Sequence, residues 1–342
     1  MEDSYYMQRC LDLARRALGN TYPNPMVGSV IVHNGEIIGE GYHHMAGQPH
    51  AEINAINSVK NPALLPESTI YVSLEPCAHY GRTPPCALKI AEIGFKRVVI
   101  GTLDSHDKVD GKGKKIIKEA NIEISTGVLE AECRQLNKRF FTYHTKKRPF
   151  IILKWAQSAD GFMDKDFKPV QISNKLASQF VHRMRADEHA ILVGTNTALR
   201  DNPNLTARNV AGKNPIRILI DFDLKVPEEN HIFNSEANTL VFNSLKEETV
   251  GHLKFIKITR ENMLETLLEK LYSEQIQSVI IEGGSHTLKT FIENGLWDEA
   301  VIITNETLVL ESGTKAPEFT AAPFHSEQMR DNRVDFYRNA RV

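Results

Sequence analysis

The chain has 342 residues, 41% of them hydrophobic and 25% charged, which is typical of a soluble globular protein with two domains. Its 41 basic and 43 acidic side chains nearly cancel, so no net field attracts nucleic acid or an anionic membrane. No apolar run reaches the roughly 18 residues of a membrane span, and the acidic, polar start lacks the plan of a secretory signal. Four cysteines are too few for a disulfide framework, so we expect a cytoplasmic protein.

The first half of the chain alternates predicted helices and strands, which favours a three-layer α/β sandwich. Residues 27–43 read as two strands joined at Asn34-Gly35, a strong hairpin signal. Further strands are predicted at 69–74, 97–102 and 122–125. Helical patterns cover 3–18, a segment beginning near His50, the residues from Pro84-Pro85 to Ile93, 112–120 and 129–144.

A basic, proline-ended stretch at 146–149 marks the predicted domain junction and gives domains 1–146 and 147–342. The second half again alternates strands with helices. We expect Ser173 to cap a helix running to about Ala186, a loop at 199–208, and another helix at 261–273. Strands are predicted from residue 150, at 189–194, 215–222, 239–243, 255–258 and 278–281, and in two closing segments, AVIITN and VDFYR.

The strongest chemical signal is a metal-binding pattern in the first half. The sequence reads HAE at 50–52 and LEPCAHYGRTPPC at 74–86. An imidazole and two thiols suit zinc, and three protein ligands leave a fourth position for water in a catalytic site. Nucleobase deaminases carry H-x-E followed by P-C-x-x-C, with the glutamate as proton shuttle; here the cysteines lie farther apart. We therefore predict a zinc site with one catalytic carboxylate and three ligands: Glu52, His50, Cys77 and Cys86.

The predicted elements place this cluster at two helix starts. His50 and Glu52 fall in the first turn of one helix, and Cys77 and Cys86 flank the first turn of another, where the helix dipole favours thiolate. A structural zinc closed by His79 is the main alternative, because structural sites usually have four protein ligands.

Two weaker signals concern anions. EGGSHT at 282–287 is a strand ending in Gly-Gly before a helix, which presents backbone N–H groups to an anion. Arg82, Arg185 and Arg208 are candidate phosphate contacts. Each of these features taken alone is more typical of an ordinary turn or a solvated charge.

Taken together, the motifs resemble one family. PNPMVG, GEGYH, AGQPHAE and LEPCAHYGRTPPC are followed by LKWAQSADG, HAILVGTNT, DNPNLTAR and IEGG, the order seen in the bifunctional riboflavin-biosynthesis deaminase/reductase. The resemblance covers nearly the whole chain. It implies a cytidine-deaminase-like α/β/α domain followed by a dihydrofolate-reductase-like α/β domain. It also implies zinc-dependent deamination of 2,5-diamino-6-ribosylamino-4(3H)-pyrimidinone 5′-phosphate, and then NADPH-dependent reduction of the ribosyl group to ribityl.

The resemblance also implies contacts, residue by residue. The substrate contacts are Asn24, in the loop that holds the pyrimidine, and then Lys154, Pro169, Arg185, Leu205, Arg208 and Glu282. The NADPH contacts are Ala156, Gln171, Thr197, Asp201, Gly284, Ser285, His286 and Thr287. Three departures stand out: Trp155 replaces a small residue, the stretch 164–173 matches only by position at Pro169 and Gln171, and Phe222 follows Asp221 where a small polar residue is usual.

The sequence is compatible with three hypotheses. The first is the bifunctional enzyme, acting on a small phosphoribosyl pyrimidine and, as the family suggests, as a homo-oligomer. The second is a monofunctional zinc deaminase with an inactive C-terminal domain. The third is a nucleic-acid-binding or tRNA-editing deaminase, which the neutral charge and the lack of a basic stripe argue against.

Overall fold

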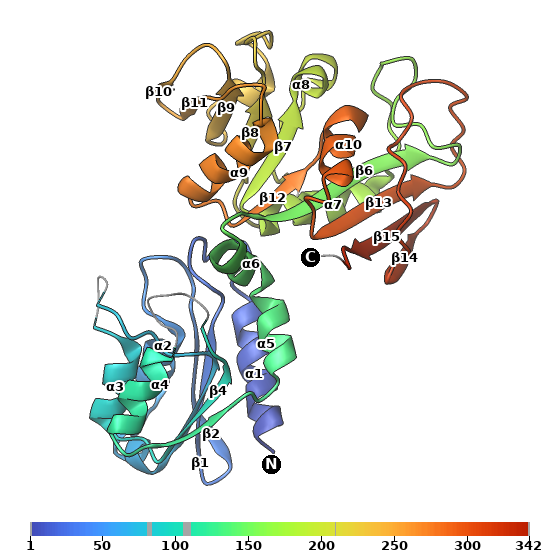
Figure 1. Ribbon diagram of the computed structural model, residues 1–342. Helices are drawn as coiled ribbons and strands as arrows, with labels where there is room; N and C mark the ends of the chain where they lie inside the picture. The colour runs from blue at the N-terminus through green and yellow to red at the C-terminus, as the bar shows by residue number, and fades with distance from the viewer. Residues whose placement is uncertain (1, 81–83, 105–110, 209, 341–342) are drawn as a thin grey trace. The chain divides into compact units, whose positions relative to one another are not determined.

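The computed structural model describes residues 2–80, 84–104, 111–208 and 210–340. The chain divides into two compact units, Met1–Lys147 and Arg148–Val342 (Figure 1). Each unit has its own sheet and its own hydrophobic core.

The described part of the first unit is built on a five-stranded sheet in the order β2-β1-β3-β4-β5. The pairs β2–β1 and β1–β3 are antiparallel, and β3–β4 and β4–β5 are parallel. The hairpin prediction is confirmed: Asn34 and Gly35, both at positive φ, form the turn between the first two strands, as a type I′ turn requires. The strands are β1 (Gly28–His33), β2 (Glu36–Tyr42), β3 (Thr69–Leu74), β4 (Arg97–Thr102) and β5 (Glu123–Thr126).

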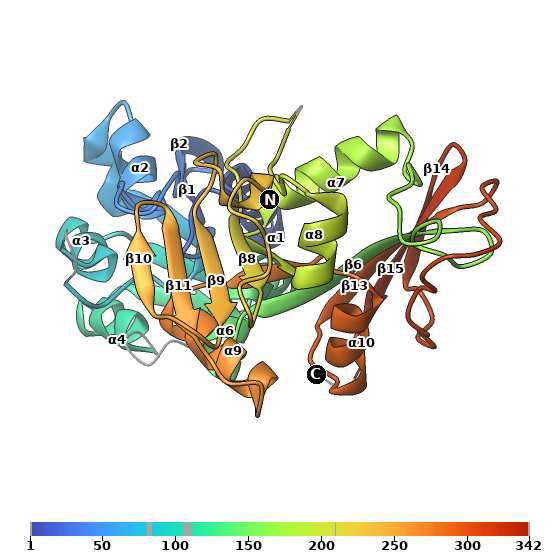
Figure 2. The same ribbon diagram turned by 90° about the horizontal axis from the view of Figure 1, so that it is seen from above.

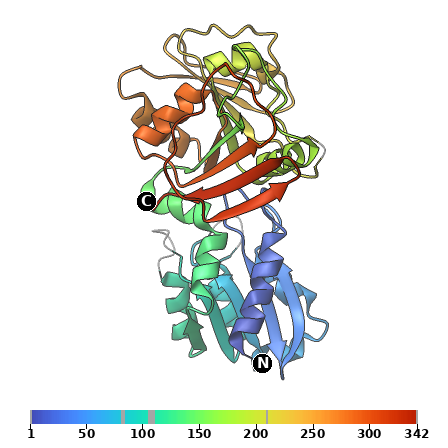
Figure 3. The same ribbon diagram turned by 90° about the vertical axis from the view of Figure 1, so that its right-hand side faces the viewer.

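Helices cover both faces of this sheet, which confirms the predicted three layers (Figures 1 and 3). One face packs against α1 and α5 through a core that includes Cys10 and Cys133. The other packs against α2, α3 and α4 through Ala55, Ile90 and Ile117. The helices are α1 (Asp3–Arg15), α2 (Ala51–Ser58), the 3₁₀ turn η1 (Pro62–Glu67), α3 (Cys86–Ile93), α4 (Lys112–Glu119), α5 (Glu130–Leu136) and α6 (Lys138–Lys146).

Two local features of this unit depend on close backbone approach. A Cβ at Gly28 would lie 1.9 Å from the carbonyl oxygen of Cys10, so α1 can touch β1 only because that residue is glycine. The single helix expected at 129–144 is in fact two helices that break at Asn137. The buried Asn137 amide bonds both the N–H and the C=O of Met26 at 2.8 Å, a long-range contact that sequence spacing does not reveal.

The second unit contains, in its described residues, a ten-stranded sheet in the order β10-β11-β9-β8-β7-β12-β6-β13-β15-β14 (Figure 2). The centre, from β11 to β13, is parallel, and the pairs at the two edges are antiparallel. The strands are β6 (Phe150–Ser158), β7 (Ala190–Gly194), β8 (Ile216–Ile220), β9 (Thr239–Asn243), β10 (Glu248–Val250), β11 (Leu253–Lys257), β12 (Ser278–Ile281), β13 (Glu299–Asn305), β14 (His325–Met329) and β15 (Asn332–Arg338).

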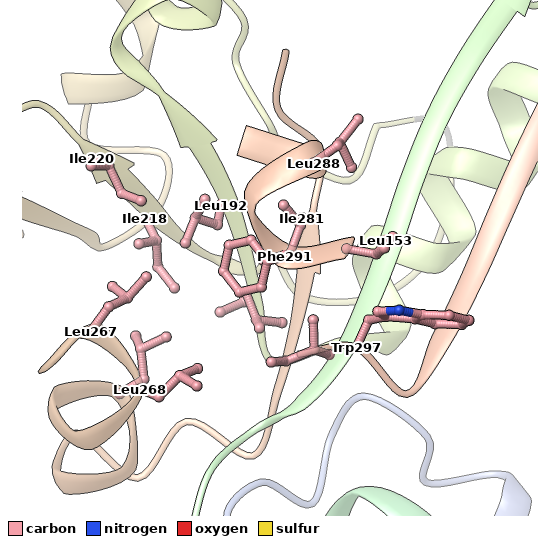
Figure 4. Close-up of a cluster of buried hydrophobic side chains, with 14 of the residues drawn as sticks. Leu153, Leu192, Ile218, Ile220, Leu267, Leu268, Ile281, Leu288, Phe291 and Trp297 are labelled. Atoms are coloured by element: carbon pink, nitrogen blue, oxygen red, sulfur yellow. The ribbon is translucent and has the colours of Figure 1, made fainter. Parts of the chain in front are cut away.

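Helices again lie on both faces of the sheet. Leu267 and Leu268 of α9 and Phe291 of α10 pack on one face, against strand residues that include Ile218 and Leu192 (Figure 4). On the other face, Ala177 and Val181 of α7 and Ala198 of α8 complete two smaller clusters. The helices are α7 (Lys175–Asp187), α8 (Thr195–Asp201), the 3₁₀ turn η2 (His231–Phe233), α9 (Met263–Ser273) and α10 (Ser285–Glu293).

Several sequence expectations for this unit were wrong in detail. Asn174, not Ser173, caps α7, because its side chain accepts from the backbone N–H groups of Leu176 and Ala177. The segment 199–208 was expected as a loop, but α8 extends into it as far as Asp201. The short edge strands β10 and β14, with their mostly exposed residues, were not predicted.

Candidate active sites

The first unit brings together the three predicted metal ligands. His50 is the N-cap of α2, Cys77 lies in the loop after β3, and Cys86 opens α3. The Nδ1 atom of His50 lies 3.5 Å from Sγ of Cys77 and 3.4 Å from Sγ of Cys86, and all three donor atoms lie within 4.8 Å of one another. Tetrahedral zinc bonded to nitrogen and sulfur holds such atoms about 3.5 Å apart. The donor set and its spacing therefore fit zinc.

The expected fourth ligand of a structural site does not join this cluster. Among the described residues, the group of side chains placed to hold a metal consists of His50, Cys77 and Cys86, whereas His79 is exposed. Three ligands and an open position are the pattern of a catalytic zinc. Arg82, a candidate phosphate contact from the sequence, lies outside the described residues.

The surroundings of Cys77 favour its thiolate form, although Cys77 does not lie in a helix. The expectation that both cysteines flank the first turn was wrong, since Cys77 lies in the loop and only Cys86 opens α3. The backbone N–H of Cys86 nevertheless donates to Sγ of Cys77 at 3.3 Å. A hydrogen bond from the Cys86 thiol, followed by one from His50, lowers the pKa of Cys77 to about 4, while the same thiol pair and burial raise the pKa of Cys86.

Glu52 is a buried carboxyl beside this cluster. It lies in the first turn of α2 and is 3% exposed. Burial, followed by the charge of Cys77, raises its pKa to about 7, although His50 opposes the rise. A carboxyl with a pKa near neutrality can both accept and donate a proton, as a general acid–base residue must.

His43 fixes the orientation of Asn24, the predicted pyrimidine contact. The His43 ring is 2% exposed, and its Nδ1 lies 3.2 Å from the carbonyl oxygen of Pro49. Nδ1 therefore carries the hydrogen, and Nε2 accepts from the Asn24 amide nitrogen at 3.0 Å. The amide oxygen of Asn24 is left as an acceptor for a ligand. From the sequence His43 is an ordinary packing histidine, and only its partners reveal this role.

Glu75 is a second residue that sequence reasoning missed. It precedes Pro76 and Cys77, is 4% exposed, and accepts three backbone N–H bonds, from Asp104, Gly111 and Lys114, at 3.0–3.2 Å. Its carboxylate thus ties the loop that carries Cys77 to the start of α4, which packs on α3. The only indication of this role in the sequence is that an acidic residue directly follows the apolar strand 69–74.

The second unit contains a cavity of about 900 Å³. It lies where β7, β8 and β12 end, the edge of a parallel sheet at which ligands usually bind. Most of the predicted reductase residues line it: Lys154, Ala156, Pro169, Gln171, Arg185, Thr197, Asp201, Glu282, Gly284, Ser285, His286 and Thr287. Leu205 and Arg208 do not. Leu205 is 2% exposed in a core cluster, and Arg208 is exposed and bonds His182 through its backbone N–H.

A charged cluster forms the floor of this cavity. Glu282 receives Lys154 Nζ at 2.5 Å on one oxygen and Arg185 Nη2 at 2.8 Å on the other. Burial alone would raise the pKa of Glu282, but the charges of Arg185 and Lys154 outweigh it and lower the pKa to about 2. The carboxylate stays ionised and holds both cations in place. Arg185 also donates to the carbonyl of Thr206 at 3.4 Å, which links it to the segment containing Leu205.

The starts of α8 and α10 form a close-fitting cradle in the same cavity. A Cβ at Gly194 would lie 2.9 Å from Thr287 Oγ1, and one at Gly284 would lie 3.2 Å from Thr197 Oγ1. Glycine therefore lets the two turns approach each other. The first N–H groups of α10 have no partner inside the helix, so the cradle fits the diphosphate of a dinucleotide.

The departures at Trp155 and Phe222 have different outcomes. Trp155 also lines the cavity, but it is 2% exposed, packs edge-on against Phe319 and donates to Gln157, so most of its ring lies in the core. Phe222 lines the cavity, where the guanidinium of Arg260 lies 4.5 Å from its ring centroid.

Two known protein families match this chain, one in each of the two units. The cytidine and deoxycytidylate deaminase zinc-binding region matches residues 1–102, and the RibD C-terminal domain matches residues 149–316. The riboflavin biosynthesis protein RibD of Aquifex aeolicus (strain VF5) is 41% identical over 307 residues, 88% of this chain and 86% of that protein. The chain belongs to the RibD family. The resemblance stated from the sequence is thereby confirmed.

Other RibD proteins and solved structures agree. RibD of Escherichia coli (strain K12) is 36% identical over 323 residues, 88% of this chain and 87% of that protein. The crystal structure of a diaminohydroxyphosphoribosylaminopyrimidine deaminase/5-amino-6-(5-phosphoribosylamino)uracil reductase from Thermotoga maritima matches with a TM-score of 0.90 and 34% identity, covering 98% of both chains. Acinetobacter baumannii RibD matches with a TM-score of 0.87 and 31% identity, again over 98% of each.

This RibD-family chain is a bifunctional enzyme of riboflavin biosynthesis, with a zinc-dependent deaminase and an NADPH-dependent reductase. In the described residues, no helix has both the length and the apolar character needed to cross a bilayer.

Proposed function

We propose that residues 1–146 deaminate 2,5-diamino-6-ribosylamino-4(3H)-pyrimidinone 5′-phosphate and that residues 147–342 reduce the ribosyl group of the product to ribityl. The observation that carries the first step is a buried carboxyl, Glu52, beside a three-donor set that leaves one tetrahedral position open. The second step is supported by the cavity that gathers the charged cluster and the glycine cradle.

In the deaminase, each side chain has one task. His50, Cys77 and Cys86 would hold zinc, which would supply a water molecule of strongly lowered pKa. Glu52 would accept a proton from that water as its oxygen bonds to the ring carbon, and would deliver the proton to the amino group, which leaves as ammonia. Asn24, whose amide nitrogen bonds His43, offers its amide oxygen to a hydrogen-bond donor on the polar edge of the pyrimidine.

In the reductase, the protein supplies position and charge while NADPH supplies the hydride. The N–H groups at the start of α10, from Gly284 to Thr287, hold the diphosphate of the cofactor. Lys154 and Arg185 present their remaining N–H donors to the substrate, and Glu282 fixes both. Leu205 and Arg208 act on the substrate only through the segment that Thr206 ties to Arg185.

The test supplies the diaminopyrimidinone phosphate to the full chain with and without NADPH and identifies the products by mass. Without NADPH we expect replacement of one amino group by oxygen, and with NADPH the further gain of two hydrogens. Deamination without any reduction would favour the monofunctional alternative. Glu52→Gln should lower deamination by at least about 100-fold with bound zinc unchanged, whereas Cys86→Ser should lower both. Loss of zinc in Glu52→Gln would contradict the catalytic role.

We further propose that the enzyme works as a cytoplasmic homo-oligomer on small molecules, without nucleic acid or membrane partners. The near balance of 41 basic and 43 acidic side chains supports the absence of nucleic-acid and membrane partners, and the oligomer follows from the family resemblance. Light scattering of the purified chain measures the oligomeric state, and a monomer at working concentration would exclude the oligomer.

A further inference from the structure

One end of the reductase cavity contains residues to which nothing so far assigns a role. Phe222, Asp223 and Lys225 follow β8, and Arg260 follows β11, two strands farther along the sheet. Arg260 Nη2 lies 2.6 Å from Asp223 Oδ1, and Lys225 Nζ lies 3.0 Å from Asp223 Oδ2. The guanidinium of Arg260 also covers the ring of Phe222 at 4.5 Å. Two cations and an aromatic face thus meet around one carboxylate.

The cations at this end of the cavity are available to a ligand. The side chains of Lys225 and Arg260 are 64% and 61% exposed. Ion pairs this exposed contribute little to stability, so a more highly charged partner can replace Asp223 at low cost. Two cations against one carboxylate leave the group with a net positive charge, which favours an anion.

The rest of the cavity decides which anion this is. The charged floor of Lys154, Arg185 and Glu282 belongs to the substrate side, and the start of α10 fits the diphosphate. A dinucleotide whose nicotinamide faces the floor must therefore direct its adenosine half toward the end of β8. In dinucleotide-binding folds an acidic residue near a strand end bonds the ribose 2′-hydroxyl of NAD, whereas a basic residue accommodates the 2′-phosphate of NADP. Here the acidic residue, Asp223, is already paired with two basic residues, Lys225 and Arg260.

We propose that Lys225 and Arg260 bind the 2′-phosphate of NADPH and set the preference for NADPH over NADH, with the Phe222–Arg260 stack as a platform for the adenosine. This proposal explains why Phe222 stands where the family usually has a small polar residue. The ring of Phe222 orients the guanidinium of Arg260, which contacts the phosphate. This inference rests on the proposed placement of the diphosphate at α10.

Equilibrium binding of 2′,5′-ADP and 5′-AMP to the full chain tests the proposal without relying on turnover. Lys225→Ala should weaken 2′,5′-ADP binding by about tenfold, because it removes a charged hydrogen bond, and should leave 5′-AMP binding within about twofold. Arg260→Ala should weaken 2′,5′-ADP binding by at least as much, and should weaken 5′-AMP binding less, because only the stacking on Phe222 is lost there. The selective loss should shrink at high salt. The ratio of KM values for NADPH and NADH should change in parallel.

Lys246→Ala is the matched control. Lys246 lies 3.7 Å from the ring centroid of Phe255 and 3.0 Å from Glu248, so it has the same kinds of partner but does not line the cavity. It should leave both affinities unchanged. Asp223→Asn should keep or increase the preference for 2′,5′-ADP.

Three results would overturn the inference: equal loss of both nucleotides in the Lys225 and Arg260 variants, no loss of either, or a loss of 2′,5′-ADP preference in Asp223→Asn. Wild-type protein that binds neither NADPH nor 2′,5′-ADP would instead refute the proposed cofactor site itself.

Discussion

Replacing Glu282 by glutamine should strongly destabilise the second unit while leaving the shape of the site intact. The change removes the single negative charge between Lys154 and Arg185, whose side chains are only 9% and 12% exposed. Two buried cations would be left side by side, and breaking a buried ion pair in this way typically costs 3–5 kcal/mol. The pKa of Glu282, lowered from 4.5 to about 2, independently corresponds to about 3 kcal/mol. We therefore expect a loss of about 3 kcal/mol.

Tryptophan emission measures this loss in the second unit alone. The chain has two tryptophans, Trp155 and Trp297, and both lie in the second unit and in its main core cluster. In urea the midpoint of the emission change should fall by about 1 M or more. Glu293→Gln is the matched control, because Glu293 lies on α10 in an exposed pair with Lys289 and should cost less than about 0.5 kcal/mol. A Glu282→Gln midpoint that coincides with this control would refute the reasoning.

The same variant predicts a pH dependence. Because the pKa of Glu282 is lower in the folded chain than in the unfolded one, its stabilisation is fully present above about pH 4.5 and is lost as pH falls toward about 2. The difference in stability between wild type and Glu282→Gln should therefore be greatest near neutrality and shrink with acidification. A difference that stays constant from pH 7 to pH 3 would show that the charge of Glu282 is not its source.

Two further predictions concern the deaminase. Glu75→Ala leaves three backbone N–H groups without their acceptor, so it should lower the stability of the first unit by about 3 kcal/mol and weaken zinc retention in competition with a chelator. Glu119→Gln, which alters an exposed ion pair at 3.9 Å, is the control. If the two variants retain zinc equally well, the proposed role of Glu75 is wrong. Asn24→Ala should raise the KM for deamination about tenfold with zinc content unchanged, and an unaltered KM would remove Asn24 from the substrate site.

The zinc cluster could be predicted because its chemistry is visible in residue types. One imidazole, two thiols and a nearby glutamate, in this order, suit few arrangements other than a catalytic zinc. The α/β class followed equally directly from alternating patterns. Neither inference required knowledge of which residues touch across the fold.

The residues that support the two sites could not be predicted, because their roles depend on partners far away in the sequence. Glu75 bonds backbone groups 29–39 residues away, and Arg260 meets Asp223 from 37 residues along the chain. Asn137 interrupts a helical pattern because its amide bonds Met26, 111 residues away. In each case the partner is brought close by the sheet order, which the local pattern leaves open.

Glu52 and Glu282 show the same limit within the active sites. Both are largely buried glutamates, and burial pushes the pKa of each upward. In Glu52 that effect dominates and gives a pKa of about 7, suited to moving a proton. In Glu282 two cations outweigh it and give a pKa of about 2, suited to a fixed charge that holds Lys154 and Arg185. The difference between a proton carrier and an anchor therefore lies in the neighbours that the fold supplies.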